Sequence, residues 1–585
     1  MYECYSGIII APMAESIRYD KYCRKGEIQV LSVVMSWIYI FLVCMLIGMG
    51  VLRLFGTKRF FLTGYLIAGI IGITVYVEFF SIFMKIGALA QGVLLTAALA
   101  AGYCCRNRIG QLWKTYRPVV FSWEGFFYFC FILLIAFYTS RGEFHTDTNI
   151  YHAAAIRIYE EYGIVRGIGN LQSHYAYNSS YLAFASLFSL RWLFGRSLHT
   201  TTGFLEVIMC LYAFRGLKNF IRHENHVTDM MRVGILLYTL VNVTRSMSPA
   251  TDYATMYFAL FILTAWCENL FEGCSDTTVY ALLSVAAVFA ATLKFSCCLL
   301  ALLALCPAYC LFKEKRWGKI LLYLLCGCVI LCPFLIRNYY LSGWLLYPFD
   351  KIDIFRPVWK IPREYLTHDA DQIKVWGRCL FDVEQVDRPV GEWLPVWWEH
   401  QFRYEKMFLG AVVISAVLQI LLLMRRLWRR QKVRPQFVVL HLAVWGNLAV
   451  WFFMAPFIRY GLAFLIAVIM AAAGDYLSER KKGFFSIVTG CLAFCILVSV
   501  SPYWDQCVTD AGVFVKQNLR KPYYIVQKDY DRGHMDSCEI NGNTIYFSTG
   551  EEINSYHVFP GTCYKPMLER STLIGDRIED GFRAK

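Results

Sequence analysis

The chain has 585 residues, of which 57% are hydrophobic and only 17% are charged, and its mean hydropathy is +0.44. A soluble protein carries about 25% charged residues, so this composition excludes an ordinary cytosolic enzyme. Aromatic residues reach 17%, which suits a chain with many membrane interfaces. The formal net charge of +14 does not indicate nucleic acid binding, because the basic residues gather in short connections between apolar segments.

Apolar runs of about 20 residues, the length that a helix needs to cross a bilayer, recur along the chain. They predict an all-α polytopic bundle of about fourteen transmembrane helices, at 31–54, 61–83, 87–103, 122–139, 200–217, 233–248, 254–270, 278–293, 295–312, 319–336, 407–424, 437–455, 460–476 and 484–501. The apolar stretch from Tyr181 to Phe194 is short and contains Arg191. We therefore expect it to be re-entrant or to lie on the membrane surface.

Short loops rich in Lys and Arg stay in the cytoplasm. With the predicted spans, the basic clusters all fall on one side of the membrane; they are Arg53/Lys58/Arg59, Arg106/Arg108/Lys114/Arg117, Arg215/Lys218/Arg222/Arg232, Lys313/Lys315/Arg316/Lys319, Arg425/Arg426/Arg429/Arg430/Lys432/Arg434 and Arg480/Lys481/Lys482. The first helices (31–139), the middle bundle (200–336) and the C-terminal helices (407–501) then leave three large pieces outside. These are the loop 140–199, the loop 337–406 and the tail 502–585.

We predict that the tail is a small soluble appendage containing a hairpin, in which Asn541-Gly542 joins 539–540 to 544–547. Cys538 and Cys563 can form a disulfide there if that side is oxidising, whereas the cysteines in apolar runs are expected to be buried free thiols. Residues 1–30 place basic side chains on the external side and lack the pattern of a signal peptide. We interpret them as a doubtful leader, with the true start as late as Met35.

The densest polar segment outside the tail is His145-Thr-Asp147-Thr-Asn149-Ile-Tyr151-His152, directly after the fourth predicted span. It runs into a helix-like stretch at 153–161, whose apolar stripe can lie on the membrane surface. The chain then breaks at Gly163 and reaches a second polar cluster, 174–180, which includes Asn178. Polar side chains at a bilayer edge are costly unless they are paired or face a watery cleft, so this loop is a candidate site. The simpler alternative is that Asp147 or Thr148 only caps a helix.

A second acid, Asp252, lies in the turn Ser248-Pro-Ala-Thr-Asp-Tyr and faces the same compartment as Asp147. Two such carboxylates can act as base and electrostatic partner, or share a divalent cation, although each alone can be a cap. Lys294, Arg337 and Arg459 lie at span ends on that face, against the usual charge distribution. An anionic lipid phosphate or pyrophosphate explains these cations, and snorkelling to headgroups is the alternative.

Several short segments have the spacing of one family: Asp147-Thr…Tyr151-His152, Ile156-Arg…Glu160-Glu-Tyr-Gly163, Gly169-Asn-Leu171, Asn178-Ser-Ser180, Ser248-Pro…Asp252, Arg337-Asn-Tyr…Ser342-Gly…Leu346-Tyr-Pro348, Pro456…Arg459-Tyr-Gly461 and Gly575-Asp…Asp580-Gly-Phe-Arg583. With them the chain resembles, from Leu31 onward, a family of uncharacterised multi-pass bacterial membrane proteins with the architecture of GT-C glycosyltransferases. Such enzymes take a sugar from a polyprenyl-phosphate carrier, usually with inversion. The resemblance implies transfer to a surface glycan or glycolipid at the external (periplasmic) face of the inner membrane.

The resemblance gives Asp147 the role of the acid that binds or deprotonates the acceptor hydroxyl, and topology makes Asp252 the second catalytic acid. The predicted substrate-binding residues are His145, Asn149, Tyr151, His152, Asn178, Lys294, Arg337, Arg459 and Tyr460. Asp147 is not part of an Asp-x-Asp pattern, because Thr146 and Thr148 flank it, and His145 and His152 belong to no complete metal motif. We therefore assign no metal ligand, and a divalent cation such as Mg or Mn stays an open alternative. The expected partners are membrane lipids, the polyprenyl-phosphate sugar and the acceptor, not nucleic acid.

Other functions stay open from the sequence. A transporter or flippase of lipid-linked saccharides also places charges inside a bundle, but transporters often contain internal repeats with broken helices, and we find no such repeat here. A polysaccharide polymerase or ligase is a nearer rival, because it too transfers sugars at the external face. A purely structural membrane protein gives no reason for five ionisable groups at one rim.

Overall fold

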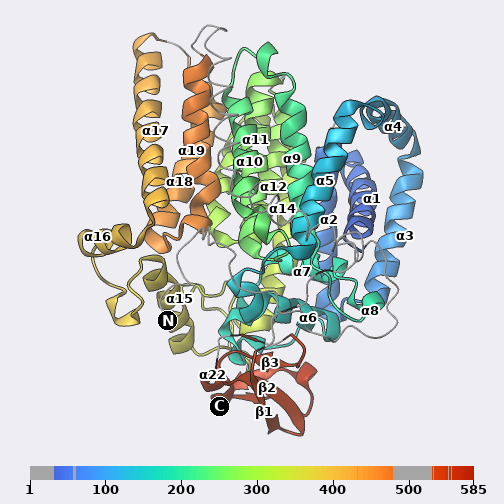
Figure 1. Cartoon of the computed structure of the whole chain (residues 1–585), viewed down its shortest axis with the longest axis vertical. Coiled ribbons are helices and arrows are strands. Elements are labelled where there is room, and N and C mark those ends of the chain that lie inside the picture. Colours follow the sequence, from blue (N-terminus) through green and yellow to red (C-terminus); the bar gives the residue numbers. More distant parts are fainter. Residues whose placement is uncertain are drawn as a thin grey trace, which may run out of the picture.

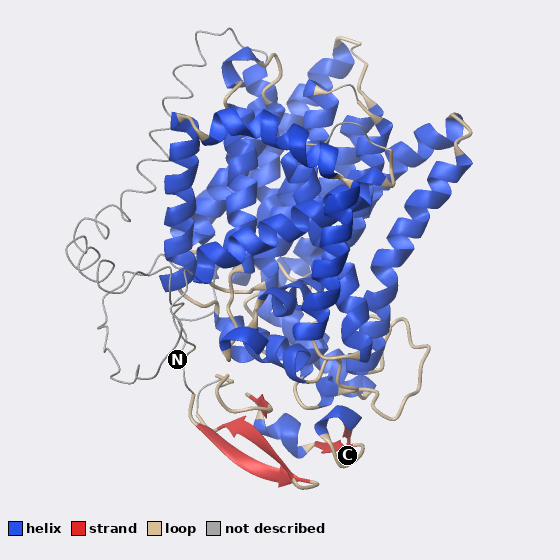
Figure 2. Cartoon of the chain, turned by 90° about the vertical axis from the view of Figure 1, so that its right-hand side faces the viewer, coloured by secondary structure: helices blue, strands red, loops and turns tan. Residues whose placement is uncertain are grey.

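The computed structural model describes residues 32–56, 61–273, 275–430, 432–478, 527, 530, 533–550, 553–554 and 556–585. These residues form a helical bundle with a small β region at one end (Figures 1 and 2). The predicted leader 1–30 and the last predicted span, 484–501, lie outside the described residues.

Nine helices in the described part of the chain are long and apolar enough to cross a membrane. They are α1 (Ser32–Arg53), α2 (Leu62–Phe83), α5 (Trp123–Arg141), α11 (Thr251–Cys267) with its extension η6 (Glu268–Glu272), η7 (Phe295–Ala304) continued by α13 (Leu305–Lys313), α14 (Trp317–Ser342), α17 (Arg403–Trp428), α18 (Pro435–Met454) and α19 (Ile458–Ser478). A tenth candidate is the pair α3 (Ala88–Cys104) and α4 (Arg106–Val120), which meet at a bend of 79°. The fold is therefore that of a mostly α-helical membrane protein.

The fourteen predicted spans are not all confirmed. Three of them, α9 (Thr201–Leu217), α10 (Val227–Asn242) and α12 (Thr277–Leu293), are helices of only 17, 16 and 17 residues. At 1.5 Å per residue such a helix is about 25 Å long, less than the hydrocarbon core of a typical bilayer. Apolar composition predicted them as spans, but the helices are shorter than the apolar runs suggested; α12 begins where the Asp276 side chain accepts a hydrogen bond from the Thr278 N–H.

Packing within the bundle follows the small residues. A Cβ on Gly48 of α1 would lie 1.8 Å from the Tyr65 carbonyl oxygen, and one on Gly69 of α2 would lie 1.9 Å from that of Cys44. The α1 and α2 backbones therefore touch directly, as small residues permit between membrane helices. The helix α11 lies at the centre of the bundle. In its most apolar stretch, 83% of the residues are buried inside the protein, compared with 11% in that of α14.

The segment 140–199 is folded against the bundle rather than spread on the membrane. The predicted helix at 153–161 is confirmed as α6 (Ala153–Glu161), but Ala153 to Ile156, Ile158 and Tyr159 are buried inside the protein, so the predicted surface stripe is wrong. The apolar stretch that follows forms α7 (Ser180–Phe188), buried along its whole length, and the short α8 (Arg191–Phe194). Both α6 and α7 pack into the main core of the protein.

The second large connection contains α15 (Arg363–Gly377) and α16 (Val390–His400). It packs on the turn between α18 and α19, where the Trp397 indole donates to the Pro456 carbonyl and Arg378 donates to that of Phe453. This end of the bundle also carries the tail, whereas the basic helix α4 lies at the opposite end (Figure 1). The two ends of the molecule therefore differ in both charge and architecture.

The predicted hairpin in the tail is confirmed. β1 (Met535–Ile540) pairs antiparallel with β2 (Asn543–Ser548) around the turn Asn541-Gly542, and β3 (Gly561–Thr562) adds to β2 in parallel. A second, two-stranded sheet joins β4 (Ser571–Leu573) to β5 (Phe582–Ala584), after the short helix α22 (Lys565–Glu569). The conditional disulfide does not join Cys538 to Cys563, and the Cys563 thiol instead donates to the Ile150 carbonyl oxygen at 3.3 Å.

Candidate functional site

The segment that carries Asp147 has an unusual backbone. Thr148–His152 forms one turn of π-helix (η1) between Asp147 and α6. Such turns widen the hydrogen-bond pattern of a helix and occur often at functional sites. The tail satisfies two of its carbonyl groups: the Asn554 N–H donates to Asn149 O at 2.9 Å, and the Cys563 thiol donates to Ile150 O at 3.3 Å. The tail thus fixes the backbone next to the predicted catalytic acid.

A buried glutamine completes this attachment. Gln172 is 0% exposed, and its side-chain amide donates to Ile150 O at 3.3 Å. Its side-chain oxygen accepts from the Thr562 hydroxyl at 3.1 Å and from the Cys563 N–H at 3.0 Å. One side chain therefore ties η1 to β3 of the tail. Sequence reasoning missed Gln172 as a functional residue, since neither its neighbours nor its spacing form a recognisable pattern.

Arg459 brings the two predicted catalytic acids together. Its Nη2 lies 3.3 Å from Asp147 Oδ2, and its Nε lies 3.4 Å from Asp252 Oδ2. Lys294 forms a second ion pair with Asp252. Arg459 and Asp252 stand in the first turns of α19 and α11, and Lys294 follows the last residue of α12. We call Asp147, Asp252, Lys294 and Arg459 the Asp147 group.

The Asp147 group is electrically balanced and reachable from solvent. It contains two carboxylates and two cations, all paired with one another. The side chains of Asp147, Lys294 and Arg459 are 20%, 24% and 28% exposed, whereas that of Asp252 is 6% exposed. The Tyr460 ring covers the cations, with Lys294 Nζ 3.2 Å from its centroid and the Arg459 guanidinium carbon 5.1 Å from it. A ligand can therefore reach both cations and Asp147, but Asp252 only through them.

His145 adds an acceptor to the Asp147 group. Its Nε2 lies 2.5 Å from Arg459 Nη1, and because a guanidinium can only donate, Nε2 accepts and the proton lies on Nδ1, which is 3.6 Å from the Asp147 carboxylate. The Asp147 N–H lies 3.1 Å from the same Nδ1, but the charged guanidinium is the stronger donor and decides the tautomer. Burial lowers the pKa of His145 to about 3, so the ring is neutral at pH 7.

Asp147 is ionised in this arrangement. Burial by itself raises the pKa of a carboxyl group and is the largest single influence here, but the neighbouring charges, led by that of Arg459, together hold the pKa of Asp147 below its usual value. The neighbouring Tyr151 ring packs at 4.3 Å from the His152 ring, and burial raises the pKa of its hydroxyl well above the usual value. Burial lowers the pKa of His152 to about 4, so this histidine is also neutral.

Two predicted substrate-binding residues lie elsewhere. Arg337 is 0% exposed, donates to Asn178 Oδ1 at 3.1 Å and to Ser81, and lies 4.5 Å from the Tyr159 ring. Asn178 is occupied on its other side by the Phe334 carbonyl, at 2.9 Å. A sealed arginine cannot touch a lipid phosphate, so Arg337 and Asn178 belong to a buried cluster, which we call the Arg337 cluster.

A cation that the sequence interpretation missed lies beside the Asp147 group. Arg245 ends the short 3₁₀ helix η5 (Val243–Arg245) and is half-buried near His145 and Tyr253. It lay inside the predicted span 233–248, which hid it. The signal was present in the sequence, because a lone Arg in an apolar run directly before Ser246-Met-Ser-Pro is an uncommon span interior.

Metal-like spacing occurs at the other end of the bundle. Among the described residues, His223, Asp229 and Glu272 place their ligand atoms within 4.8 Å of one another. Arg232 already forms ion pairs with both acids, with Nη1 at 3.0 Å from Asp229 and 2.8 Å from Glu272. This set lies at the far ends of α10 and α11 from Arg245 and Asp252. Its guanidinium makes it an ion-pair network rather than a metal centre.

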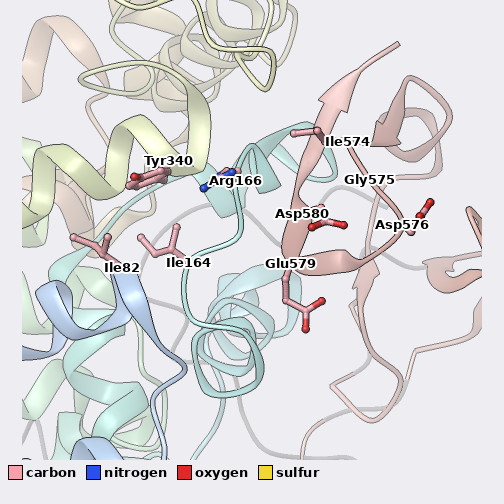
Figure 3. Close-up of a pocket in the computed structure, with 9 residues that line it drawn as sticks. All are labelled: Ile82, Ile164, Arg166, Tyr340, Ile574, Gly575, Asp576, Glu579 and Asp580. Atoms are coloured by element: carbon pink, nitrogen blue, oxygen red, sulfur yellow. The ribbon is translucent and has the colours of Figure 1, made fainter.

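One groove at the surface lies apart from the Asp147 group. It has a volume of about 600 Å³ and opens between the tail, the segment after α6 and the end of α14. Figure 3 shows Arg166 and Tyr340 on one side and Asp576, Glu579 and Asp580 of the tail on the other. None of the predicted site residues lines it.

The fold defines an integral membrane protein of many helices, with a charged group at the end of the bundle that carries the β region. The chain belongs to the family described as a domain of unknown function (DUF8201), whose model matches residues 30–466. That match includes the whole Asp147 group but not the tail. No curated protein and no solved structure gives a significant match to this chain.

Proposed function

We propose that this protein is an integral membrane glycosyltransferase of GT-C type. It transfers a sugar from a polyprenyl-phosphate donor to a surface glycan or glycolipid at the outer face of a bacterial inner membrane. The observation that carries the proposal is the meeting of Asp147, Asp252, Lys294 and Arg459, from four distant parts of the chain, at an accessible end of the bundle. Acids next to cations suit a reaction in which an alcohol loses a proton while a phosphate departs.

The pairing of Asp147 with Arg459 gives this reaction an order. With Arg459 beside it, Asp147 is a weak base, because its pKa lies below the usual value. When a lipid phosphate takes the Arg459 guanidinium, Asp147 loses its main cation and its pKa rises. Donor binding then prepares the base for the acceptor hydroxyl.

In the transfer step, the acceptor oxygen forms a bond to the anomeric carbon and its proton passes to Asp147. The bond between the anomeric carbon and the phosphate oxygen breaks, and the lipid phosphate leaves with the electron pair. Arg459 and Lys294 stabilise the charge that develops on this phosphate. Asp252 holds Lys294 and Arg459 in place as their shared counter-ion.

The test compares lipid-linked sugars and surface glycans by mass spectrometry in cells that carry the wild-type gene, no gene, or Asp147→Asn. We expect the transfer rate of Asp147→Asn to fall by roughly 10²- to 10⁴-fold, the usual contribution of a general base. A hexose-sized mass should disappear from a glycan, and the lipid-linked sugar should accumulate. Asp353→Asn is the matched control, since this acid pairs with Arg356 and Lys360 in the second large connection.

Two results would reject the proposal. Wild-type glycans in the Asp147→Asn strain would show that Asp147 is not the general base. An intact lipid-linked oligosaccharide stranded in the deletion strain, with Asp147→Asn behaving as wild type, would instead indicate a flippase. A polymerase or ligase would be recognised by the chain length of the glycan, which changes by many sugars rather than one.

A further inference from the structure

The closing segment Gly575-Asp…Asp580-Gly-Phe-Arg583 takes no part in the Asp147 group, yet it builds one wall of the groove in Figure 3. Arg166, which follows α6, and Tyr340, in the last turn of α14, stand on the opposite wall. We call this space of about 600 Å³ the tail groove. Its volume lies within the range of about 300–1,000 Å³ that is typical of ligand sites.

Backbone contacts fix the walls of the tail groove relative to one another. The Phe582 N–H of β5 donates to Arg166 O at 2.8 Å, and the Gly167 N–H donates to Tyr340 O at 2.7 Å. Gly167 has a φ of +61°, and a Cβ there would lie 2.1 Å from the Phe582 carbonyl oxygen, so only glycine allows this approach. Three distant parts of the chain are thus joined around the groove, which is formed before any ligand binds.

The first wall presents a hydrogen-bond donor and aromatic rings. The guanidinium carbon of Arg166 lies 5.9 Å from the centroid of the Tyr340 ring and 5.5 Å from that of the Trp359 ring. These two rings stack on each other, with centroids 6.2 Å apart. A guanidinium can only donate hydrogen bonds. Since Arg166 is exposed to solvent, a ligand in the groove can accept from it.

The second wall presents acceptors. Asp576, Glu579 and Asp580 are exposed, and an ionised carboxylate can only accept hydrogen bonds. Asp580 is held in place, because its Oδ2 accepts from the Arg577 N–H at 2.9 Å and lies against the backbone of Gly575. In the described structure the three acids do not bring their oxygens within 4.8 Å of one another, as a metal ion would require.

We infer that the tail groove binds the saccharide of a surface glycan. A ligand that fills it must accept hydrogen bonds on one wall, donate them on the other and contact Tyr340 and the isoleucine side chains between them. A sugar ring meets all three demands, because its neighbouring hydroxyls both accept and donate and its C–H faces are apolar. That the saccharide belongs to a surface glycan rests on the proposed function, but binding of a saccharide can be tested without it.

A small zwitterion, such as an amino acid or a short peptide, would also meet both charges. We favour the saccharide because the charged side chains of both walls are exposed, and an exposed charge pair contributes only about 0–1 kcal/mol. Affinity must then come from several hydrogen bonds and from contact with the apolar surface. The tail that carries the second wall is tied to η1 through Gln172, so a bound glycan is held by the unit that also positions Asp147.

The experiment applies the purified full-length protein in nanodiscs to an array of oligosaccharides released from bacterial surface glycans, and titrates the one that binds best. We expect the double variant Asp576→Asn/Glu579→Gln to weaken its binding by roughly ten- to a hundredfold, and Arg166→Leu by about three- to tenfold. Asp536→Asn is the matched control, since this acid is exposed on β1 of the same tail but does not line the groove. Thermal unfolding confirms that each variant is folded.

A second readout separates the tail groove from the Asp147 group. Asp147→Asn should bind the oligosaccharide as wild type does. The double variant Asp576→Asn/Glu579→Gln should raise the KM for the acceptor while kcat stays within about twofold, because it removes binding and not chemistry. If the saccharide binds through these acids but no sugar is transferred, the inference stands and the proposed function fails.

Three results would overturn the inference. The first is an array on which no oligosaccharide is retained. The second is wild-type affinity in both Arg166→Leu and the double variant, which would place the saccharide elsewhere. The third is displacement of the oligosaccharide by alanyl-alanine at equal concentration, which would identify the groove as a site for a zwitterion.

Discussion

The Asp147 group and the Arg337 cluster are both charged assemblies in a membrane protein, but they differ in access. Arg337 is fully buried, and Asn178, Ser81 and the Tyr159 ring surround it. In the Asp147 group, by contrast, three of the four side chains are 20% to 28% exposed. Both kinds of residue looked alike in the sequence, as cations at the ends of apolar runs. The comparison teaches that burial, not residue type, separates a structural ion pair from a candidate site.

The largest effect on stability is expected in the Arg337 cluster. Arg337→Met leaves the buried Asn178 Oδ1 and the Ser81 hydroxyl without this donor, which costs about 1–3 kcal/mol for each group. The loss is measured as folding yield and thermal unfolding in detergent. The double variant Ser81→Ala/Arg337→Met should recover part of the stability, because it removes a hydroxyl that the single variant leaves without this partner. A double variant no better than the single one would show that Arg337 acts through packing instead.

Arg459→Gln is expected to affect function more than stability. The free energy of unfolding should change by only about 1 kcal/mol, since the group is partly exposed, whereas sugar transfer should fall strongly. The pKa of Asp147 should rise, because Arg459 is the strongest of the neighbouring charges that lower it. The acidic limb of the pH–rate profile should therefore move to higher pH.

The sign of the associated stability change follows from the same shift. A carboxyl whose pKa is depressed in the folded protein stabilises it above its ordinary pKa, and that stability is lost as the pH falls toward the folded value. The free energy of unfolding of Arg459→Gln should therefore decrease less on acidification than that of the wild type. A pH–rate profile of Arg459→Gln that coincides with the wild-type pH–rate profile would show that Asp147 takes no part in the reaction.

The smallest effect on sugar transfer is expected where the tail meets η1. Gln172→Leu keeps the volume but leaves the Ile150 carbonyl and the Cys563 N–H without this partner, which costs about 1–3 kcal/mol. Limited proteolysis should cleave the tail faster in this variant, and transfer activity should decrease with it. Gln385→Leu, in the second large connection, serves as the control. If the tail stays equally protected in Gln172→Leu, the amide does not hold it.

Much of the candidate site was predictable because helix ends are local features. Asp147 follows an apolar run, Asp252 begins another, and Lys294 and Arg459 stand at similar boundaries. All four residues were therefore expected at the same depth, at helix ends on one side of the membrane. Their lateral position was not predictable. Arg337 occupies the same kind of boundary but contacts Asn178 and Ser81 instead of the two acids. That choice depends on how α14 packs against α2 and the segment before α7. The boundary of α10 was predicted too late in the chain, and that error concealed Arg245.

The sequence by itself determined the helical membrane architecture, the hairpin at Asn541-Gly542 and the polar segment around Asp147, because hydropathy, turn chemistry and clustered polar residues act over a few neighbours. Only the tertiary structure decided that Arg459 bridges two acids, that Arg337 is sealed away and that Gln172 ties the tail to η1. Those contacts join residues more than 150 positions apart in the chain, as in Asn178 and Arg337, 159 positions apart. Such pairs are set by which helices pack together, and helix packing in a bilayer depends on small-residue surfaces and buried polar contacts along the whole bundle.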